Sequence, residues 1–108
     1  MCITMADLNQ QEWSSRLYSD NNAVILDVRT QEEVDEGRIP NALHIDIYKG
    51  QGFIDEVEQL DKVKTYYVYC RSGKRSAQAC SVMNQLGFEN CHNLLGGFMD
   101  WTGDVEII

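Results

Sequence analysis

The chain has 108 residues, 44% of them hydrophobic, and a formal net charge of -8 at pH 7. This length and composition are typical of one globular domain with its own core, so we expect a single domain over residues 1–108. The acidic balance argues against nucleic acid and against an acidic membrane surface as partners. There is no apolar run of about 18 residues and no charged-then-apolar leader, so we predict a cytoplasmic protein without a membrane span.

The first predicted elements are a strand and a helix. Residues 2–5 predict a short edge strand. Asp7 is a candidate N-cap for a helix that carries Leu8, Trp13 and Leu17. The spacing of these apolar residues predicts that one face of the helix packs against the core.

A buried strand, a capped helix and a second strand are predicted next. The apolar run at 23–28 is typical of a strand buried on both faces of a parallel sheet. Thr30, followed three residues later by Glu33, predicts a capping box on a short helix that ends at Gly37. The acidic residues of this helix predict a solvated face. Residues 43–47 alternate apolar and polar side chains, which indicates a half-exposed strand.

The rest of the chain continues this alternation. Residues 53–60 have helical apolar spacing, residues 66–69 are a β-prone run, and residues 91–95 predict another strand. A longer helix follows the β-prone run, with apolar residues at Ala79, Val82, Met83 and Leu86. The pair Gly96-Gly97 precedes a last short helix. Strands that alternate with helices predict an α/β fold with a mostly parallel sheet and helices on both faces.

One short loop stands between the run at 66–69 and the helix after it. The loop consists of Cys70, Arg71, Ser72, Gly73, Lys74 and Arg75. A helix N-terminus offers unpaired N–H groups and a partial positive charge, both of which favour a thiolate or a bound oxyanion. Because three cations lie close by, we predict that the pKa of Cys70 is below that of a free thiol and that Cys70 is the nucleophile. Ligands of parallel sheets lie beyond the carboxyl ends of the strands, where Cys70 is expected.

The other cysteines and the histidines predict structural roles. Cys80 falls on the core side of its helix and is expected to pack there, with a resolving thiol as the alternative. Cys2 and Cys91 have no flanking cations and are expected to be structural. The cysteine spacing contains no zinc-ligand pattern, and His44 and His92 have no evident ligating partner, so we expect no metal and no other cofactor.

Four segments of the chain resemble the single-domain rhodanese (sulfurtransferase) family. They are LDVRTQEEVDEGRIPNA at 26–42, YCRSGKRS at 69–76, LGF at 86–88 and LLGGFMDW at 94–101. Together with the elements between them they cover nearly the whole chain. The Cys70 loop is the most specific segment, because it follows the right strand and precedes the right helix. The chain departs from the family at Arg38 and Asn41, where the family often has histidine and glycine.

The resemblance implies a rhodanese-like fold with a five-stranded parallel sheet, in which the loop forms a cup around the cysteine. It also implies a ping-pong reaction. The Cys70 thiolate takes the sulfane sulfur of thiosulfate or a similar small anionic donor, releases sulfite and becomes a persulfide. Cyanide, a thiol or a partner protein then accepts the sulfur. The residues expected to hold the donor and the persulfide are Arg71, Ser72, Gly73, Lys74, Arg75 and Ser76.

Two other pairs of residues are expected to support the loop. Asp27 and Arg29 match the family's Asp-Val-Arg segment, and we expect them to pair with each other or with backbone. Gly96 and Gly97 are expected to bring the backbone close to the site.

Two other functions stay open. A persulfide carrier or docking module would accept sulfur from a partner protein and turn over little thiosulfate. A cysteine phosphatase or arsenate reductase would resemble this site, but such enzymes place one more residue between the nucleophile and the phosphate-binding arginine than the four that separate Cys70 from Arg75. A loop shorter by one residue, about 3.8 Å of chain, favours a cup sized for a single sulfur.

Overall fold

A central sheet of five parallel strands organises the protein. The computed structural model describes residues 4–107, and the strand order is β1-β5-β4-β2-β3. The elements in chain order are β1 (Thr4–Leu8), α1 (Gln10–Ser19), β2 (Ala23–Asp27), α2 (Gln31–Asp35), β3 (Leu43–His44), α3 (Gln51–Val57), β4 (Thr65–Tyr69), α4 (Lys74–Gln85) and β5 (Asn90–Leu94). Short 3₁₀ turns lie at Ile47–Lys49 and Phe98–Asp100. The predicted α/β fold with a five-stranded parallel sheet is confirmed.

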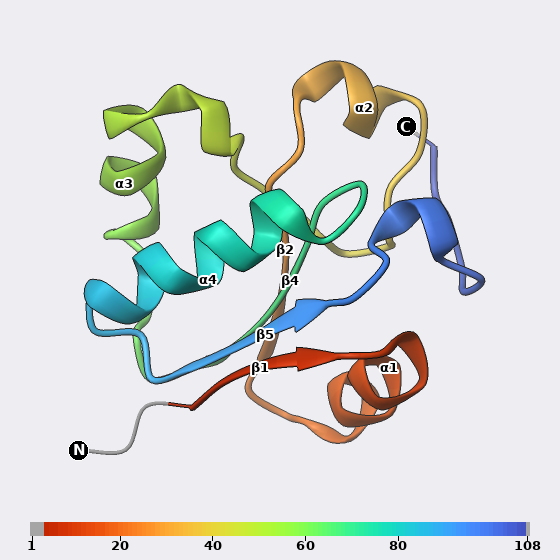
Figure 1. The fold of residues 1–108 in the computed structure, drawn as a ribbon, viewed down its shortest axis with the longest axis horizontal. Coiled ribbons are helices and arrows are strands. Elements are labelled where there is room, and N and C mark those ends of the chain that lie inside the picture. Colours follow the sequence, from red (N-terminus) through yellow and green to blue (C-terminus); the bar gives the residue numbers. More distant parts are fainter. Residues whose placement is uncertain (1–3, 108) are drawn as a thin grey trace.

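Helices cover both faces of this sheet. Figure 1 shows α3 and α4 on one face and α1 on the other, with α2 near the end at which the strands terminate. Within the part of the chain that the structure describes, no helix is long and apolar enough to cross a membrane.

The residues of β4 alternate between two hydrophobic cores. Tyr66 and Val68 belong to the core under α3 and α4, whereas Tyr67 and Tyr69 belong to the core under α1, where Trp13 packs. These β4 side chains are all buried because the strand lies in the middle of the sheet. The tyrosine cluster therefore serves the packing of both cores, and the loop after β4 starts from a fixed strand.

The N-terminal prediction needs a correction. Asp7 and Leu8 lie in β1, which pairs in parallel with β5, and the N-cap of α1 is Asn9 instead of Asp7. The Asn9 side chain accepts a hydrogen bond from the N–H of Glu12 at 2.9 Å. Strand pairing prevailed over the capping preference of Asp7, because Leu8 buries its side chain in the α1 core. Of the strand predicted at 2–5, the first two residues lie outside the described part.

Further along, the predicted strand at 43–47 is shorter than expected. β3 comprises only Leu43 and His44, and Leu43 is exposed while Ile45 is buried. The backbone N–H of Ile45 still bonds to Asp27 of β2, but a 3₁₀ turn then begins at Ile47. The alternation of apolar residues therefore reflected an edge segment that turns away from the sheet.

The other helix predictions were closer to the structure. The capping box of Thr30 and Glu33 on α2 is confirmed. α3 ends at Val57, before the last residue of the predicted segment 53–60, and the last helix is a single 3₁₀ turn.

Asn41 explains one departure from the family pattern. Its φ of 69° is the only positive value among the described non-glycine residues. Asparagine tolerates this left-handed conformation better than other residues with a side chain, and glycine tolerates it without steric cost. The other departure, Arg38, forms an ion pair with Glu106 at 2.9 Å, which fastens the C-terminal segment to the chain after α2.

We predict that replacement of Asn41 by valine lowers the free energy of unfolding by about 1–3 kcal/mol, because a β-branched residue is strained at positive φ. Asn41→Gly is the matched control and should change stability by less than about 1 kcal/mol. Urea unfolding of the three proteins measures both values. Equal effects of the two substitutions would contradict the conformational explanation.

Candidate active site

Cys70 stands directly after β4, at the carboxyl end of the middle strand, and its residue is fully buried. Its sulfur accepts a hydrogen bond from the backbone N–H of Gly73 at 3.1 Å and lies 3.3 Å from the Ser76 hydroxyl oxygen. Gly73 has a φ of 100° and is the N-cap of α4. A Cβ at Gly73 would lie 3.2 Å from the carbonyl oxygen of Leu94. Both the positive φ and this close contact therefore favour glycine at this position. The loop thus curls around the sulfur.

The segment after β5 holds this loop from outside. The N–H of Phe98 donates to the carbonyl of Cys70 at 2.8 Å, and the N–H of Met99 donates to the carbonyl of Arg71 at 2.9 Å. A Cβ at Gly97 would lie only 2.4 Å from the Arg71 carbonyl oxygen. The predicted close approach of Gly96-Gly97 to the site is confirmed, with Gly97 making it.

The Cys70 thiol is easier to ionise than an ordinary cysteine. Burial raises its pKa, but hydrogen bonds from the Ser76 hydroxyl and from the N–H groups of Ser76, Gly73 and Ser72 outweigh burial and bring the pKa below the ordinary value. The direction agrees with the sequence prediction. Of the two causes expected from the sequence, the N–H groups at the start of the helix contribute together with the Ser76 hydroxyl, whereas the three cations are not among the main causes.

Arg75 has a partner that the sequence did not reveal. Its two terminal nitrogens donate to the two carboxylate oxygens of Glu33 at 2.7 and 2.9 Å. These bonds lower the pKa of Glu33 to about 2. Glu33 also accepts from the N–H and hydroxyl of Thr30, so one carboxylate caps α2 and ties α2 to α4. The expectation that the whole acidic face of α2 is solvated was wrong for Glu33.

The remaining two cations of the loop are free to meet an anion. Arg71 and Lys74 are exposed, whereas Arg75 is half-buried beneath Glu33 and over the ring of Tyr48. Arg71 borders a pocket of about 350 Å³ whose other lining residues are Arg29, Glu33, Glu36, Phe98 and Met99. Ser72 is also exposed, at the tip of the loop.

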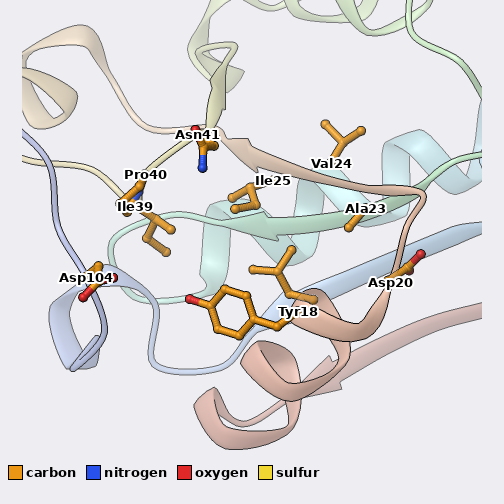
Figure 2. Close-up of a pocket in the computed structure, with 10 residues that line it drawn as sticks. Tyr18, Asp20, Ala23, Val24, Ile25, Ile39, Pro40, Asn41 and Asp104 are labelled. Carbon is orange, nitrogen blue, oxygen red and sulfur yellow. The ribbon is translucent and has the colours of Figure 1, made fainter.

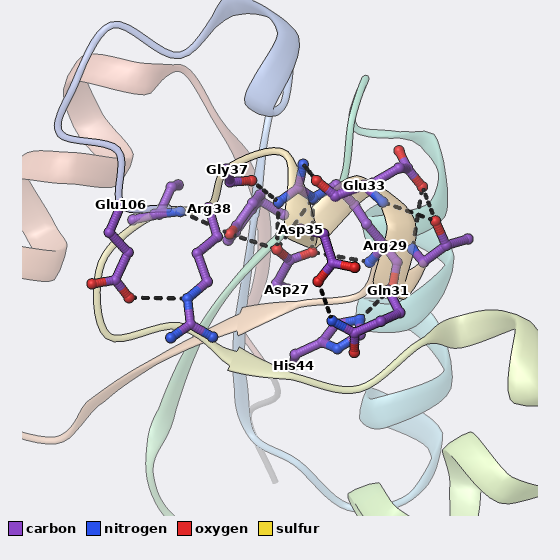
Figure 3. Close-up of polar contacts among 12 residues, drawn as sticks. Asp27, Arg29, Gln31, Glu33, Asp35, Gly37, Arg38, His44 and Glu106 are labelled. Carbon is purple, nitrogen blue, oxygen red and sulfur yellow. Dashed lines mark hydrogen bonds and ion pairs between the residues drawn. The ribbon is translucent and has the colours of Figure 1, made fainter. Parts of the chain in front are cut away.

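Asp27 and Arg29 form a buried ion pair at the end of β2, as predicted (Figure 3). The guanidinium of Arg29 bonds to both carboxylate oxygens of Asp27 and to the carbonyl of Gly37 at 2.8 Å. The Tyr69 hydroxyl donates to Asp27 at 2.7 Å. The pair therefore fixes the end of β4, one residue before Cys70, to the chain after α2.

Among residues 4–107, the hydrogen bonds to the Cys70 sulfur come from Gly73 and Ser76 and not from another thiol or a histidine. Cys80 and Cys91 are free and buried, and the hydrogen bond that the Cys80 thiol shares with Cys91, followed by burial, raises the pKa of Cys80. His44 donates from Nε2 to the carbonyl of Arg29, and burial lowers the pKa of His92. Among residues 4–107, no three histidine, cysteine or acidic side chains form a group that could hold a metal ion.

A second pocket, of about 590 Å³, lies on the α1 side of the sheet (Figure 2). Tyr18, Asp20, Ile39 and Asp104 are among its lining residues. It contains no cysteine and none of the loop residues. We therefore assign the candidate chemistry to the Cys70 loop.

Comparisons with known proteins agree with this fold. The model of the rhodanese-like domain family matches residues 10–104. YtwF of Bacillus subtilis, provisionally named a sulfurtransferase, is 41% identical over 105 residues, which are 96% of this chain and 97% of that protein. GlpE of Coxiella burnetii, named a thiosulfate sulfurtransferase, is 36% identical over 85 residues, covering 79% of this chain and 77% of that protein.

Solved structures also show similarity to rhodanese-like domains. The crystal structure of a rhodanese-like domain protein from Staphylococcus aureus superposes with a TM-score of 0.81 at 32% identity, covering 96% of this chain and 99% of that chain. A five-stranded parallel sheet with a cysteine loop at its carboxyl end defines the class. The chain belongs to the rhodanese-like sulfurtransferase family.

We predict that Glu33→Gln lowers the free energy of unfolding by about 1–2 kcal/mol at pH 7, because glutamine cannot replace the two charged bonds to Arg75. The folded-state pKa of Glu33, about 2, is below its usual 4.5. Its contribution is therefore complete above pH 4.5 and is lost as the pH falls toward 2. Urea unfolding of wild type and variant across this range measures the difference.

Glu32→Gln is the matched control, since it makes the same charge change on the exposed side of the same helix. It should alter stability by no more than about 0.5 kcal/mol. A pH-independent difference between wild type and Glu33→Gln would show that the ion pair is not its cause.

Proposed function

We propose that this protein is a sulfurtransferase that works through a persulfide on Cys70. The Cys70 thiolate attacks the terminal sulfur of thiosulfate or a similar donor. The donor's S–S bond breaks, its electron pair leaves with sulfite, and Cys70 holds the transferred sulfur as an anionic persulfide. A thiol, a partner protein or cyanide then attacks that sulfur, and the Cys70 thiolate leaves.

The observation that carries this proposal is the set of hydrogen-bond donors around one buried sulfur. The N–H of Gly73 and the hydroxyl of Ser76 point at Cys70, and its pKa is lowered as a nucleophilic thiolate requires. Such donors stabilise negative charge where it develops, first on the thiolate and then on the persulfide. The same donors serve the leaving thiolate in the second half of the reaction.

Burial of Cys70 favours a slender donor. The residue is 0% exposed, so a donor has to present one terminal atom to the cup through a local opening of the loop. The terminal sulfur of thiosulfate meets this requirement better than a tetrahedral phosphate ester does. The relative named a thiosulfate sulfurtransferase supports the same choice.

We predict that wild-type protein incubated with thiosulfate gains one sulfur, about 32 Da, and that cyanide removes it. Cys70→Ser should gain none, because its hydroxyl is not ionised at neutral pH and does not attack the sulfane sulfur. Intact-mass spectrometry measures both steps.

Cys80→Ser is the control for this experiment, since Cys80 is a buried thiol in the middle of α4, outside the Cys70 loop. It should gain and lose the sulfur as wild type does. If wild type gains sulfur from a protein persulfide but none from thiosulfate, the protein is a carrier and thiosulfate is not its donor. If it gains none from either and hydrolyses phosphate esters, the sulfurtransferase proposal fails.

We also predict that Arg71→Ala and Lys74→Ala each raise the KM for thiosulfate by about 3–10-fold and leave kcat nearly unchanged. Both cations are exposed beside the loop and attract the dianion before the chemical step. Lys64→Ala is the control, because Lys64 is exposed at the opposite end of β4. Steady-state kinetics at low and at high salt tests this, and an effect of the loop variants on kcat alone would contradict it.

A further inference from the structure

A chain of hydrogen-bonded side chains leads from the Cys70 sulfur to β1. Ser76 lies 3.3 Å from the sulfur and also bonds to Oδ1 of Asn93 on β5. Nδ2 of Asn93 donates to a carboxylate oxygen of Asp7 at 2.9 Å and to the carbonyl of Gly73 at 3.1 Å. Cys70, Ser76 and Asn93 are buried, whereas Asp7 is exposed. The sulfur transfer proposed above gives no role to Asn93 or Asp7.

The orientation of the Asn93 amide follows from its neighbours. The carboxylate of Asp7 and the carbonyl of Gly73 can only accept hydrogen bonds. The NH₂ group of Asn93 must therefore face them, and its oxygen must face Ser76. That oxygen is an acceptor, so the contact between Asn93 and Ser76 requires the hydroxyl proton of Ser76.

The Ser76 hydroxyl thus has one proton, and two acceptors lie beside it, Oδ1 of Asn93 and the sulfur of Cys70. While the proton points at Asn93, the Ser76 oxygen turns a lone pair to the sulfur and can accept a bond from the S–H of Cys70. A Cys70 thiolate has no proton to donate and needs the Ser76 proton for itself. Asn93 is only 2% exposed, so water does not readily replace the donor that it then loses.

We infer that Asn93, held by Asp7, competes with Cys70 for the single hydroxyl proton of Ser76 and is a positioning residue that favours the protonated thiol. When Cys70 ionises, its proton leaves to solvent and the Ser76 hydroxyl rotates from Asn93 to the sulfur. In the persulfide the inner sulfur has neither proton nor charge, so the hydroxyl can return to Asn93. This inference rests on the proposed role of Cys70 as the nucleophile.

The competition sets how readily the thiolate forms and leaves. The charged groups around this thiol are Arg71 in the loop, Lys74 and Arg75 on α4, Glu33 on α2 bonded to Arg75, and Asp7 on β1. These charges are the same whether the Ser76 proton points to Asn93 or to the sulfur. Removal of the Ser76 hydroxyl and removal of its competing acceptor, Asn93, should therefore shift the pKa of Cys70 in opposite directions. Loss of structure alone would not produce opposite shifts.

The test is the pH dependence of Cys70 alkylation by iodoacetamide, followed by mass spectrometry of the Cys70 peptide. Ser76→Ala removes a donor to the thiolate and should raise the apparent pKa by about one unit. Asn93→Leu removes the competing acceptor and should lower it by about half a unit. In the Ser76→Ala background, Asn93→Leu should change little, since there is no proton left to share.

Several results would overturn the inference. One such result is that Asn93→Leu leaves the apparent pKa of Cys70 unchanged or raises it. Another is that Asn93→Leu lowers this pKa by the same amount in the wild-type and Ser76→Ala backgrounds. The effect of Asn93 would then act through its bond to Gly73 or through the loop. Circular dichroism and urea unfolding show whether each variant folds. If Asn93→Leu does not fold, Asn93→Ala takes its place in the same double-mutant cycle, because it also removes the competing acceptor without changing any charge, and it should show the same direction and the same dependence on Ser76.

The alkylation assay contains no sulfur donor, so it separates this inference from the proposed function. If wild type takes sulfur from thiosulfate but the two variants shift the pKa in the same direction, sulfur transfer stands and the competition is wrong. If the shifts are opposite and no donor loads Cys70, the competition stands and the sulfurtransferase proposal falls.

Discussion

The hydrogen bonds that converge on the Cys70 sulfur are the constraint on which the rest of the site depends. They require that the backbone after β4 turns back on itself, and only the left-handed conformation of Gly73 allows the turn at that point. This turn also requires that Gly97 lies close to the loop backbone, because the N–H groups of Phe98 and Met99, which follow it, donate to the carbonyls of Cys70 and Arg71. The low pKa of the thiol is therefore a property of a folded loop and not of the cysteine itself.

Two ion pairs hold this loop at a fixed place relative to the sheet. The buried pair of Asp27 and Arg29 anchors the end of β4 through Tyr69, and the pair of Glu33 and Arg75 anchors the first turn of α4 to α2. The fully buried pair of Asp27 and Arg29 contributes little net stability because of its desolvation cost, but it fixes geometry. The carboxylate of Glu33 both caps α2 and ties it to α4, and Arg29 holds the chain after α2 at the carbonyl of Gly37.

The sequence predicted the sheet, the order of its elements and the loop, because these follow from local patterns. The β-prone run before Cys70 and the glycine three residues after it lie next to each other in the sequence, so they can be recognised without the structure. The partners of the loop could not be predicted from the sequence, since Glu33 and Asn93 belong to distant segments that only the fold brings together. For the same reason Asp7 was misread as a helix cap, because its position in β1 depends on pairing with β5 at the far end of the chain.

The central claim is that the transferred sulfur resides on Cys70 alone. Its most direct test is to load the protein with thiosulfate, block all thiols and persulfides with an alkylating reagent, and map the extra sulfur by peptide mass spectrometry. This account predicts the additional sulfur, about 32 Da, only on the peptide that contains Cys70. Sulfur on the peptide of Cys80 or Cys91, with Cys70 unmodified, would contradict it.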